Sequence, residues 1–75
     1  MLLSELEPGC AVRIGSLAGV EPAVRRKLMV MGLLPHTEVR LLRTAPFGDP
    51  LQVAADGITL SLQRALAGQI EVELV

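Results

Sequence analysis

The segment LQVAADGITLSL, residues 51–62, carries an Asp-Gly pair between two runs of alternating apolar and polar or small residues. Asp-Gly is strongly favoured in two-residue hairpin turns, because both turn positions adopt positive φ. A two-residue loop at 56–57 sets the register, and the opposed pairs are Ala55 with Ile58, Val53 with Leu60, and Leu51 with Leu62. All of these residues are apolar and fall on one face, as strand geometry requires. We therefore predict a β-hairpin with one face turned toward a core.

One substantial helix is predicted at about residues 22–31. Pro22 suits the first helical position, where its missing N–H costs nothing. Gly32 stands where a left-handed residue commonly ends a helix. Apolar residues at helical spacing predict the face that packs on the core, and these are Val24, Leu28 and Met31.

Alternating patterns predict three more strands, at residues 11–17, 37–43 and 70–74. Short helical turns are expected at residues 64–68 and at the chain start, where Ser4-x-x-Glu7 reads as a capping box. Leu3 and Leu6 would then cover one end of the core. The predicted fold is mainly β, a small and partly open five-stranded antiparallel barrel with one inserted helix, formed by a single domain over residues 1–75.

Composition narrows the possible functions. The chain of 75 residues is 51% hydrophobic, yet it has no Trp or Tyr and a single Phe, so the core must be aliphatic. The net charge is −1, which provides no overall attraction to nucleic acid or anionic lipid. The longest uncharged apolar run, residues 28–35, is too short to insert across a bilayer. The start of the chain lacks a basic region typical of a signal peptide, so we expect a cytoplasmic protein.

Three segments in this order resemble the FeoA family: RRKLMVMGLLPHTEV, RTAPFGDPLQV and LSLQRALAGQIEV. The resemblance extends over nearly the whole chain, from LEPG to IEVEL. It implies an SH3-like barrel and a role beside FeoB, the bacterial ferrous iron transporter, a membrane protein with a cytoplasmic GTPase domain. Two positions depart from the family pattern. His36 replaces a Gly and is expected to adopt positive φ, and Gln63 replaces an Arg, with Arg64 beside it.

The family resemblance raises the question of an iron site, and the residues argue against one. A ferrous site favours His and carboxylate ligands that converge, but His36 is the single histidine and only Glu38 is close to it in sequence. Cys10 is the single cysteine, and we expect it to be a small buried or half-buried side chain and not a metal ligand. We predict no metal site, no cofactor and no catalytic residue. A metal carrier using His36, Cys10 or an intermolecular site stands as a weaker alternative.

Phe47 lies in the APFGDP turn, between Pro46 and Pro50. The prolines stiffen the loop, which favours binding of a partner, whereas burial of the ring would plug the barrel. We expect Phe47 to be partly buried, with the loop and the helix forming one apolar edge. With no other aromatic residue, a polyproline-binding groove is not expected.

The predicted partner is the FeoB-type transporter. The helix region carries more apolar residues than one face can bury, and the predicted contact residues are Leu28, Met29, Met31, Leu33, Pro46, Phe47 and Arg64. Arg25, Arg26 and Lys27 form either a solvated face or a contact with an acidic partner. Weak self-association is also expected from exposed strand edges. The alternative function is a free-standing SH3-like regulatory domain, related to the C-terminal domain of iron-dependent repressors, that acts on a transcription regulator.

Overall fold

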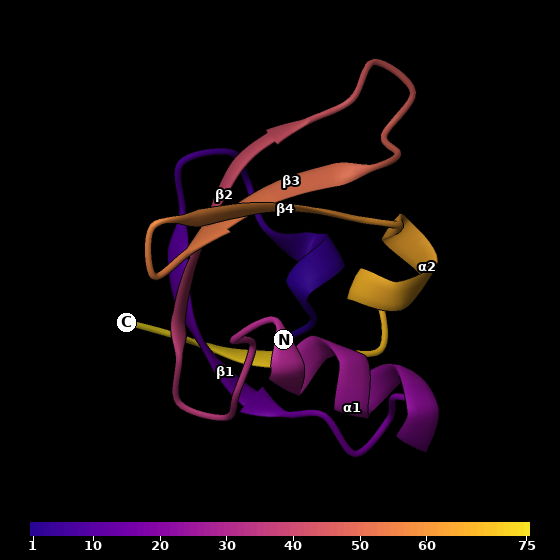
Figure 1. Cartoon of the computed structure of the whole chain (residues 1–75). Helices are drawn as coiled ribbons and strands as arrows, with labels where there is room; N and C mark the ends of the chain where they lie inside the picture. Colours follow the sequence, from indigo (N-terminus) through magenta and orange to yellow (C-terminus); the bar gives the residue numbers. More distant parts are fainter.

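Five antiparallel strands form a single curled sheet in the computed structural model, which describes residues 1–75 (Figure 1). The strands are β1 (Ala11–Ser16), β2 (Glu38–Thr44), β3 (Leu51–Ala55), β4 (Ile58–Leu62) and β5 (Glu71–Leu74). The helical elements are the 3₁₀ turn η1 (Leu3–Glu5), α1 (Pro22–Val30) and α2 (Arg64–Ala67). The sheet order is β4-β3-β2-β1-β5, so β4 and β5 are its edges. The predicted mainly β fold, with five antiparallel strands and one inserted helix, is confirmed.

The β3–β4 hairpin has the predicted register. Its pairs include Ala55 with Ile58 and Leu51 with Leu62. Asp56 and Gly57 have φ values of 50° and 78°, as a type I′ turn requires. On β3 the inward face is buried along its whole length, and Ala55 at the turn end is 5% exposed, whereas on β4 Ile58 is 50% exposed and Leu62 is 4% exposed. At the turn end, only the β4 side of the hairpin therefore lies outside the core.

A core of 16 apolar residues fills the interior, and no polar side chain is buried with them. Every strand and helical element contributes, and the members are Leu3, Val12, Ile14, Leu17, Val20, Leu28, Leu33, Val39, Leu41, Leu51, Val53, Ala55, Leu62, Ala67, Ile70 and Val72. Leu3 is buried and Leu6 packs against the cluster, which confirms that the chain start covers one end.

The N-terminal turn differs from the predicted capping box. The 3₁₀ turn covers Leu3–Glu5, and the Glu5 carboxylate accepts a hydrogen bond from the Leu2 backbone N–H at 2.6 Å. The predicted capping box, Ser4-x-x-Glu7, is thus wrong. The acidic residue that caps the turn is Glu5, two residues before Glu7, because Glu5 already lies close to the free N–H groups of the turn.

Helix α1 begins at Pro22 as predicted and ends at Val30, with Gly32 at φ 97° just beyond it. Leu28 is its single buried residue and Val24 is partly buried. Met31 was expected on the same face, but it is 41% exposed. The reason is that the helix has already ended there, and the reversal at Gly32 lets Leu33 enter the core instead. His36 adopts φ 72°, which confirms its expected left-handed conformation.

We predict that Leu28→Ala lowers the free energy of unfolding by about 2–5 kcal/mol, because it removes a fully buried side chain from a close-packed core. Urea denaturation followed by circular dichroism would measure the loss as a lower midpoint with an unchanged slope. Val30→Ala is the matched control on the same helix, since Val30 is 82% exposed. A similar loss for both variants would contradict the assignment of Leu28 to the core.

Candidate protein-interaction site

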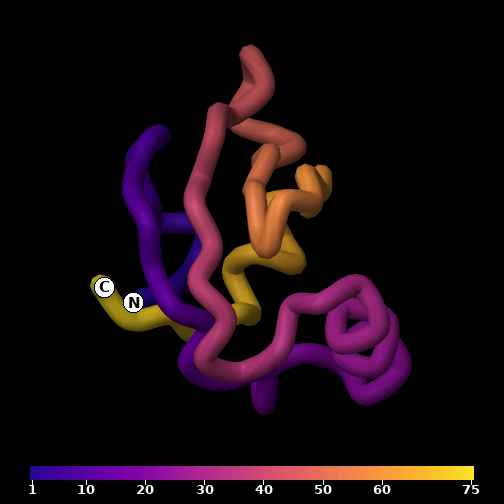
Figure 2. Tube along the Cα trace, turned by 60° about the vertical axis from the view of Figure 1, so that its left-hand side comes forward, coloured from indigo at the N-terminus to yellow at the C-terminus, as the bar shows by residue number.

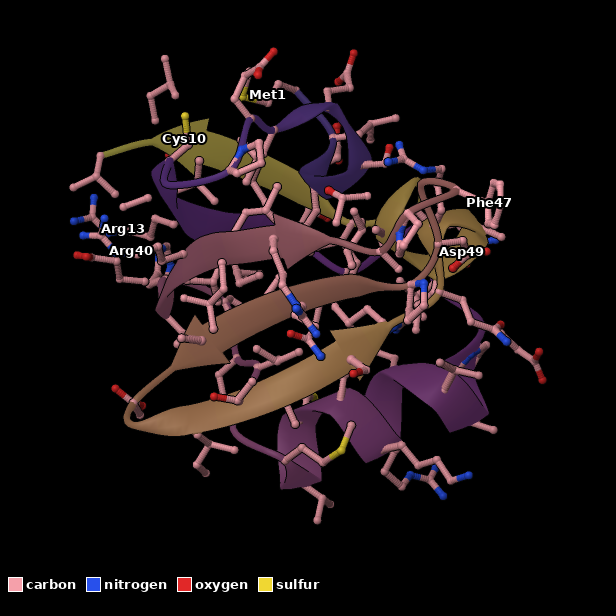
Figure 3. All side chains as sticks on the ribbon, turned by 90° about the horizontal axis from the view of Figure 1, so that it is seen from above. Met1, Cys10, Arg13, Arg40, Phe47 and Asp49 are labelled. Atoms are coloured by element: carbon pink, nitrogen blue, oxygen red, sulfur yellow. The ribbon has the colours of Figure 1, made fainter.

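Phe47 is 99% exposed, at the tip of the loop between β2 and β3 (Figure 3). We name residues 45–50 the Phe47 loop. The expectation that the ring is partly buried is therefore wrong. The interior is already filled by aliphatic side chains, and the turn directs Phe47 outward instead of over the barrel mouth. A large apolar side chain left entirely in water is uncommon and indicates a contact surface when it is held in place.

The Phe47 loop has a defined backbone structure. The Gly48 N–H donates to the Ala45 carbonyl at 2.8 Å, which closes a four-residue β-turn with Phe47 at its third position. Pro46 occupies the second position, where its fixed φ suits such a turn. Gly48 has φ 84°, and the Ala45 N–H donates to the Pro50 carbonyl at 3.0 Å across the loop base. The amino acid at each position therefore matches the conformation the loop adopts.

Arg64 fastens this loop to the rest of the molecule. Its Nε donates to the Gly48 carbonyl at 2.6 Å, and its backbone N–H donates to Asp49 Oδ1 at 3.0 Å. Its Nη1 donates to the Ser4 carbonyl in η1 at 3.1 Å. The rigid, planar guanidinium can satisfy separate acceptors at once, which a lysine ammonium on a flexible stem does less well. Arg64 was predicted as a partner contact, and the structure shows it joining η1, the Phe47 loop and α2.

A second exposed apolar surface lies on the outer side of α1 and just beyond its end. We name Met29, Val30, Met31 and Leu34, which are 37%, 82%, 41% and 46% exposed, the α1 surface. A shallow groove of about 520 Å³ beside it is lined by Ala23, Arg26, Lys27, Val30 and Met31. Methionine adapts its shape readily and is common at binding surfaces. The groove therefore combines apolar walls with two cations.

Not all of the predicted contact residues are accessible. Leu28 is 1% exposed and Leu33 is 0% exposed, so both belong to the core and no partner can reach them in the folded chain. Arg25 is half-buried, and its Nη2 donates to the Val20 carbonyl at 3.0 Å. Arg26 and Lys27 are exposed and have free side chains in the structure. The charged contact would thus depend on these two residues.

The Phe47 loop and α1 do not form one apolar edge. Figures 1 and 2 place the loop at the top of the molecule and α1 at the bottom, and Figure 1 shows α2 between them. The groove beside α1 is lined by helix and helix-end residues alone. The expectation of a single edge is therefore wrong. The Phe47 loop and α1 lie at opposite ends of the sheet, so their apolar residues are not neighbours.

Potential metal ligands are dispersed. No three His, Cys, Asp or Glu side chains lie close enough together to hold a metal ion. Cys10 is half-buried and His36 is exposed. Figure 3 shows Cys10 and Phe47 at opposite sides of the molecule.

No helix is long and apolar enough to cross a membrane.

Comparisons with known proteins agree with this architecture. The family model of the FeoA domain matches residues 1–74. The FeoA protein of Chlorobium tepidum is 41% identical; the match covers 100% of this chain and 70% of that protein, with a TM-score of 0.95. A manganese-dependent transcriptional repressor is 21% identical, with coverage of 100% and 41% and a TM-score of 0.88, which is a likeness of fold alone.

A further relative is the Stenotrophomonas maltophilia FeoA, crystallised with zinc. It is 28% identical, the match covers 97% of this chain and 89% of that protein, and the TM-score is 0.84. That protein is described as a prokaryotic SH3 domain protein proposed to act as a bacterial ferrous iron transport activating factor.

The curled five-stranded sheet with its inserted helix is thus the fold of a small SH3-like domain. The family match over almost the whole chain narrows this class further. The chain belongs to the FeoA family, as the three sequence segments indicated.

We call the hydrogen bonds from Arg64 to Gly48, Asp49 and Ser4 the clamp on the Phe47 loop. This clamp could not be predicted from the sequence. Arg64 is 16 residues from Gly48 and 60 from Ser4, so no local pattern connects them. The one available signal was the family element LSLQR, in which Gln63 replaces the usual arginine. The neighbouring Arg64 makes the contacts with the loop.

We predict that Arg64→Ala loosens the Phe47 loop. The amide protons of Ala45 and Gly48 should exchange with solvent about tenfold faster, because the loop loses a charge-assisted hydrogen bond worth roughly 1.5 kcal/mol. Hydrogen exchange followed by NMR would measure this. Arg26→Ala removes an exposed arginine that does not contact the loop and serves as the control. Unchanged exchange in Arg64→Ala would show that the loop is ordered without the clamp.

Proposed function

We propose that this chain is a cytoplasmic accessory protein of bacterial ferrous iron uptake, which binds a FeoB-type transporter and modulates it without catalysing a reaction. Membership of the FeoA family supports the link to ferrous iron transport. The single observation that carries a binding role is the fully exposed Phe47 on a clamped loop. Covering an exposed apolar side chain with another molecule removes it from water, and this lowers the free energy of the complex.

The Phe47 loop is suited to insertion into a pocket on the partner. Its hydrogen bonds and the clamp from Arg64 have already fixed its conformation, so little conformational entropy is lost on binding. Burial of one phenylalanine side chain contributes roughly 1.5–3 kcal/mol. Phe47 and Pro46 would thus form the apolar centre of the contact, and Arg64 would act by holding them in place.

The α1 surface would supply a second contact with the transporter. Met29 and Met31 offer adaptable apolar area, and Arg26 and Lys27 beside them favour an acidic partner surface. Because the Phe47 loop and α1 are well separated, a partner that touches both must extend along the height of the sheet (Figure 1). This arrangement fits a large folded domain better than a short peptide.

Modulation requires that binding differs between states of the transporter. A ligand shifts an equilibrium only by the difference between its affinities for the two states. The GTPase domain of a FeoB-type protein offers such states in its nucleotide-free, GDP-bound and GTP-bound forms. The proposal is therefore that this chain prefers one of them.

The test measures binding of the chain to the detergent-solubilised FeoB-type transporter of the same cell in each nucleotide state. We predict that Phe47→Ser weakens the affinity by about 10–100-fold, since a buried phenylalanine contact worth roughly 1.5–3 kcal/mol is lost. Isothermal titration calorimetry would provide the dissociation constants. Leu74→Ser is the matched control, because Leu74 is 69% exposed in β5, outside both the Phe47 loop and the α1 surface.

Two outcomes would contradict the proposal at different levels. Equal affinity for all nucleotide states would exclude control of the nucleotide cycle and leave a simple adaptor. Failure of the native chain to bind in every state would remove the transporter as partner. The alternative of a domain that acts on a transcription regulator would then be tested by recovery of a DNA-bound complex that contains this chain.

A further inference from the structure

The two edges of the sheet are protected very differently. At one edge, β5 carries the charged residues Glu71 and Glu73, and the chain start lies alongside it. The Val72 N–H donates to the Met1 carbonyl at 2.8 Å, and Leu2 forms a bridge with Glu71. Charges and covering segments are the usual means by which sheets avoid pairing with other chains. The β5 edge is thus protected in both ways.

The β4 edge has neither form of protection. Its sequence, Ile-Thr-Leu-Ser-Leu, contains no charge and no proline. In the hairpin register, Ile58, Leu60 and Leu62 direct their backbone groups to β3, so those of Thr59 and Ser61 point outward. None of the hydrogen bonds outside the regular helices and strands involves residues 58–62. The outward N–H and C=O groups of both residues are therefore available to another strand.

We propose that β4 pairs with β4 of a second copy of this chain, in antiparallel orientation around a two-fold axis at Leu60. In this register Thr59 lies opposite the partner's Ser61, and Ser61 lies opposite the partner's Thr59. Each of these pairs exchanges both backbone hydrogen bonds, because all the groups involved point outward in both copies. The two sheets then become one continuous sheet, and the two unprotected edges cover each other.

The second copy is favoured as the occupant because the strand is complementary to itself. The pairing brings only uncharged side chains opposite one another. It also places Ile58, which is 50% exposed, opposite the partner's Leu62, so the apolar face of the hairpin continues across the junction. Self-pairing through β5 or α1 would instead bring glutamates or cations together. A two-fold contact of this kind closes on itself and stops at the dimer.

This inference is independent of the proposed function, since it needs no transporter and uses a different part of the surface. An interface of one short strand pair is small, so we expect a weak dimer with a dissociation constant on the order of 100 µM to 1 mM. Sedimentation equilibrium over a range of protein concentrations would detect it.

The register provides a sharp test with two double variants. In Thr59→Lys/Ser61→Lys, like charges face each other at both pairs, and dimerisation should weaken by at least about tenfold. Thr59→Glu/Ser61→Glu should behave in the same way. An equimolar mixture should form a heterodimer, because each introduced lysine then lies opposite an introduced glutamate. Both positions are exposed, so the fold should be retained, which circular dichroism would verify.

The control is Ala18→Lys/Gln69→Lys, which adds the same two charges at exposed positions away from β4 and should dimerise like the native chain. Single Thr59→Lys would replace the double variant if that one failed to fold. A native chain that stays monomeric up to about 1 mM would overturn the proposal. So would a dimer that persists in the lysine variant, or a mixture of the two variants that stays monomeric.

Discussion

The core is built from aliphatic side chains alone, and every element of the fold contributes to it. With no polar or charged residue among the core side chains, the interior depends on the shape and volume of these side chains. Leu28 and Leu33 are both used in the interior, which is filled by 16 aliphatic side chains. Phe47, the single aromatic residue, is not part of this interior and lies at the surface, 99% exposed.

Features determined by adjacent residues were predicted well from the sequence. Asp56-Gly57 specified the hairpin register, Pro22 and Gly32 bounded the helix, and His36 took the conformation expected of it. Apart from the capping box at the chain start, the errors arose where distant parts of the chain decide the outcome. Met31 lost its place in the core to Leu33, and Phe47 was not needed inside a filled barrel. These outcomes depend on three-dimensional packing, which periodicity along the chain does not describe.

The surface separates into regions with different physical character. The Phe47 loop offers a rigid apolar tip, the α1 surface combines methionines with cations, and the β4 edge offers unpaired backbone groups. A side-chain contact of the first kind discriminates between partners by shape, whereas backbone pairing is nearly independent of side-chain identity. Contacts with a transporter and contacts between copies would therefore not compete for the same atoms.

The clamp made by Arg64 also has a consequence for the order in which the protein matures. Ser4, Gly48 and Arg64 meet although Ser4 and Arg64 are 60 residues apart. During synthesis the loop residues leave the ribosome before Arg64 does, and they gain their final anchor only when most of the chain has emerged. The Phe47 loop can therefore be fixed only after Arg64 has been synthesised, so the contact surface is displayed late in the synthesis of the domain.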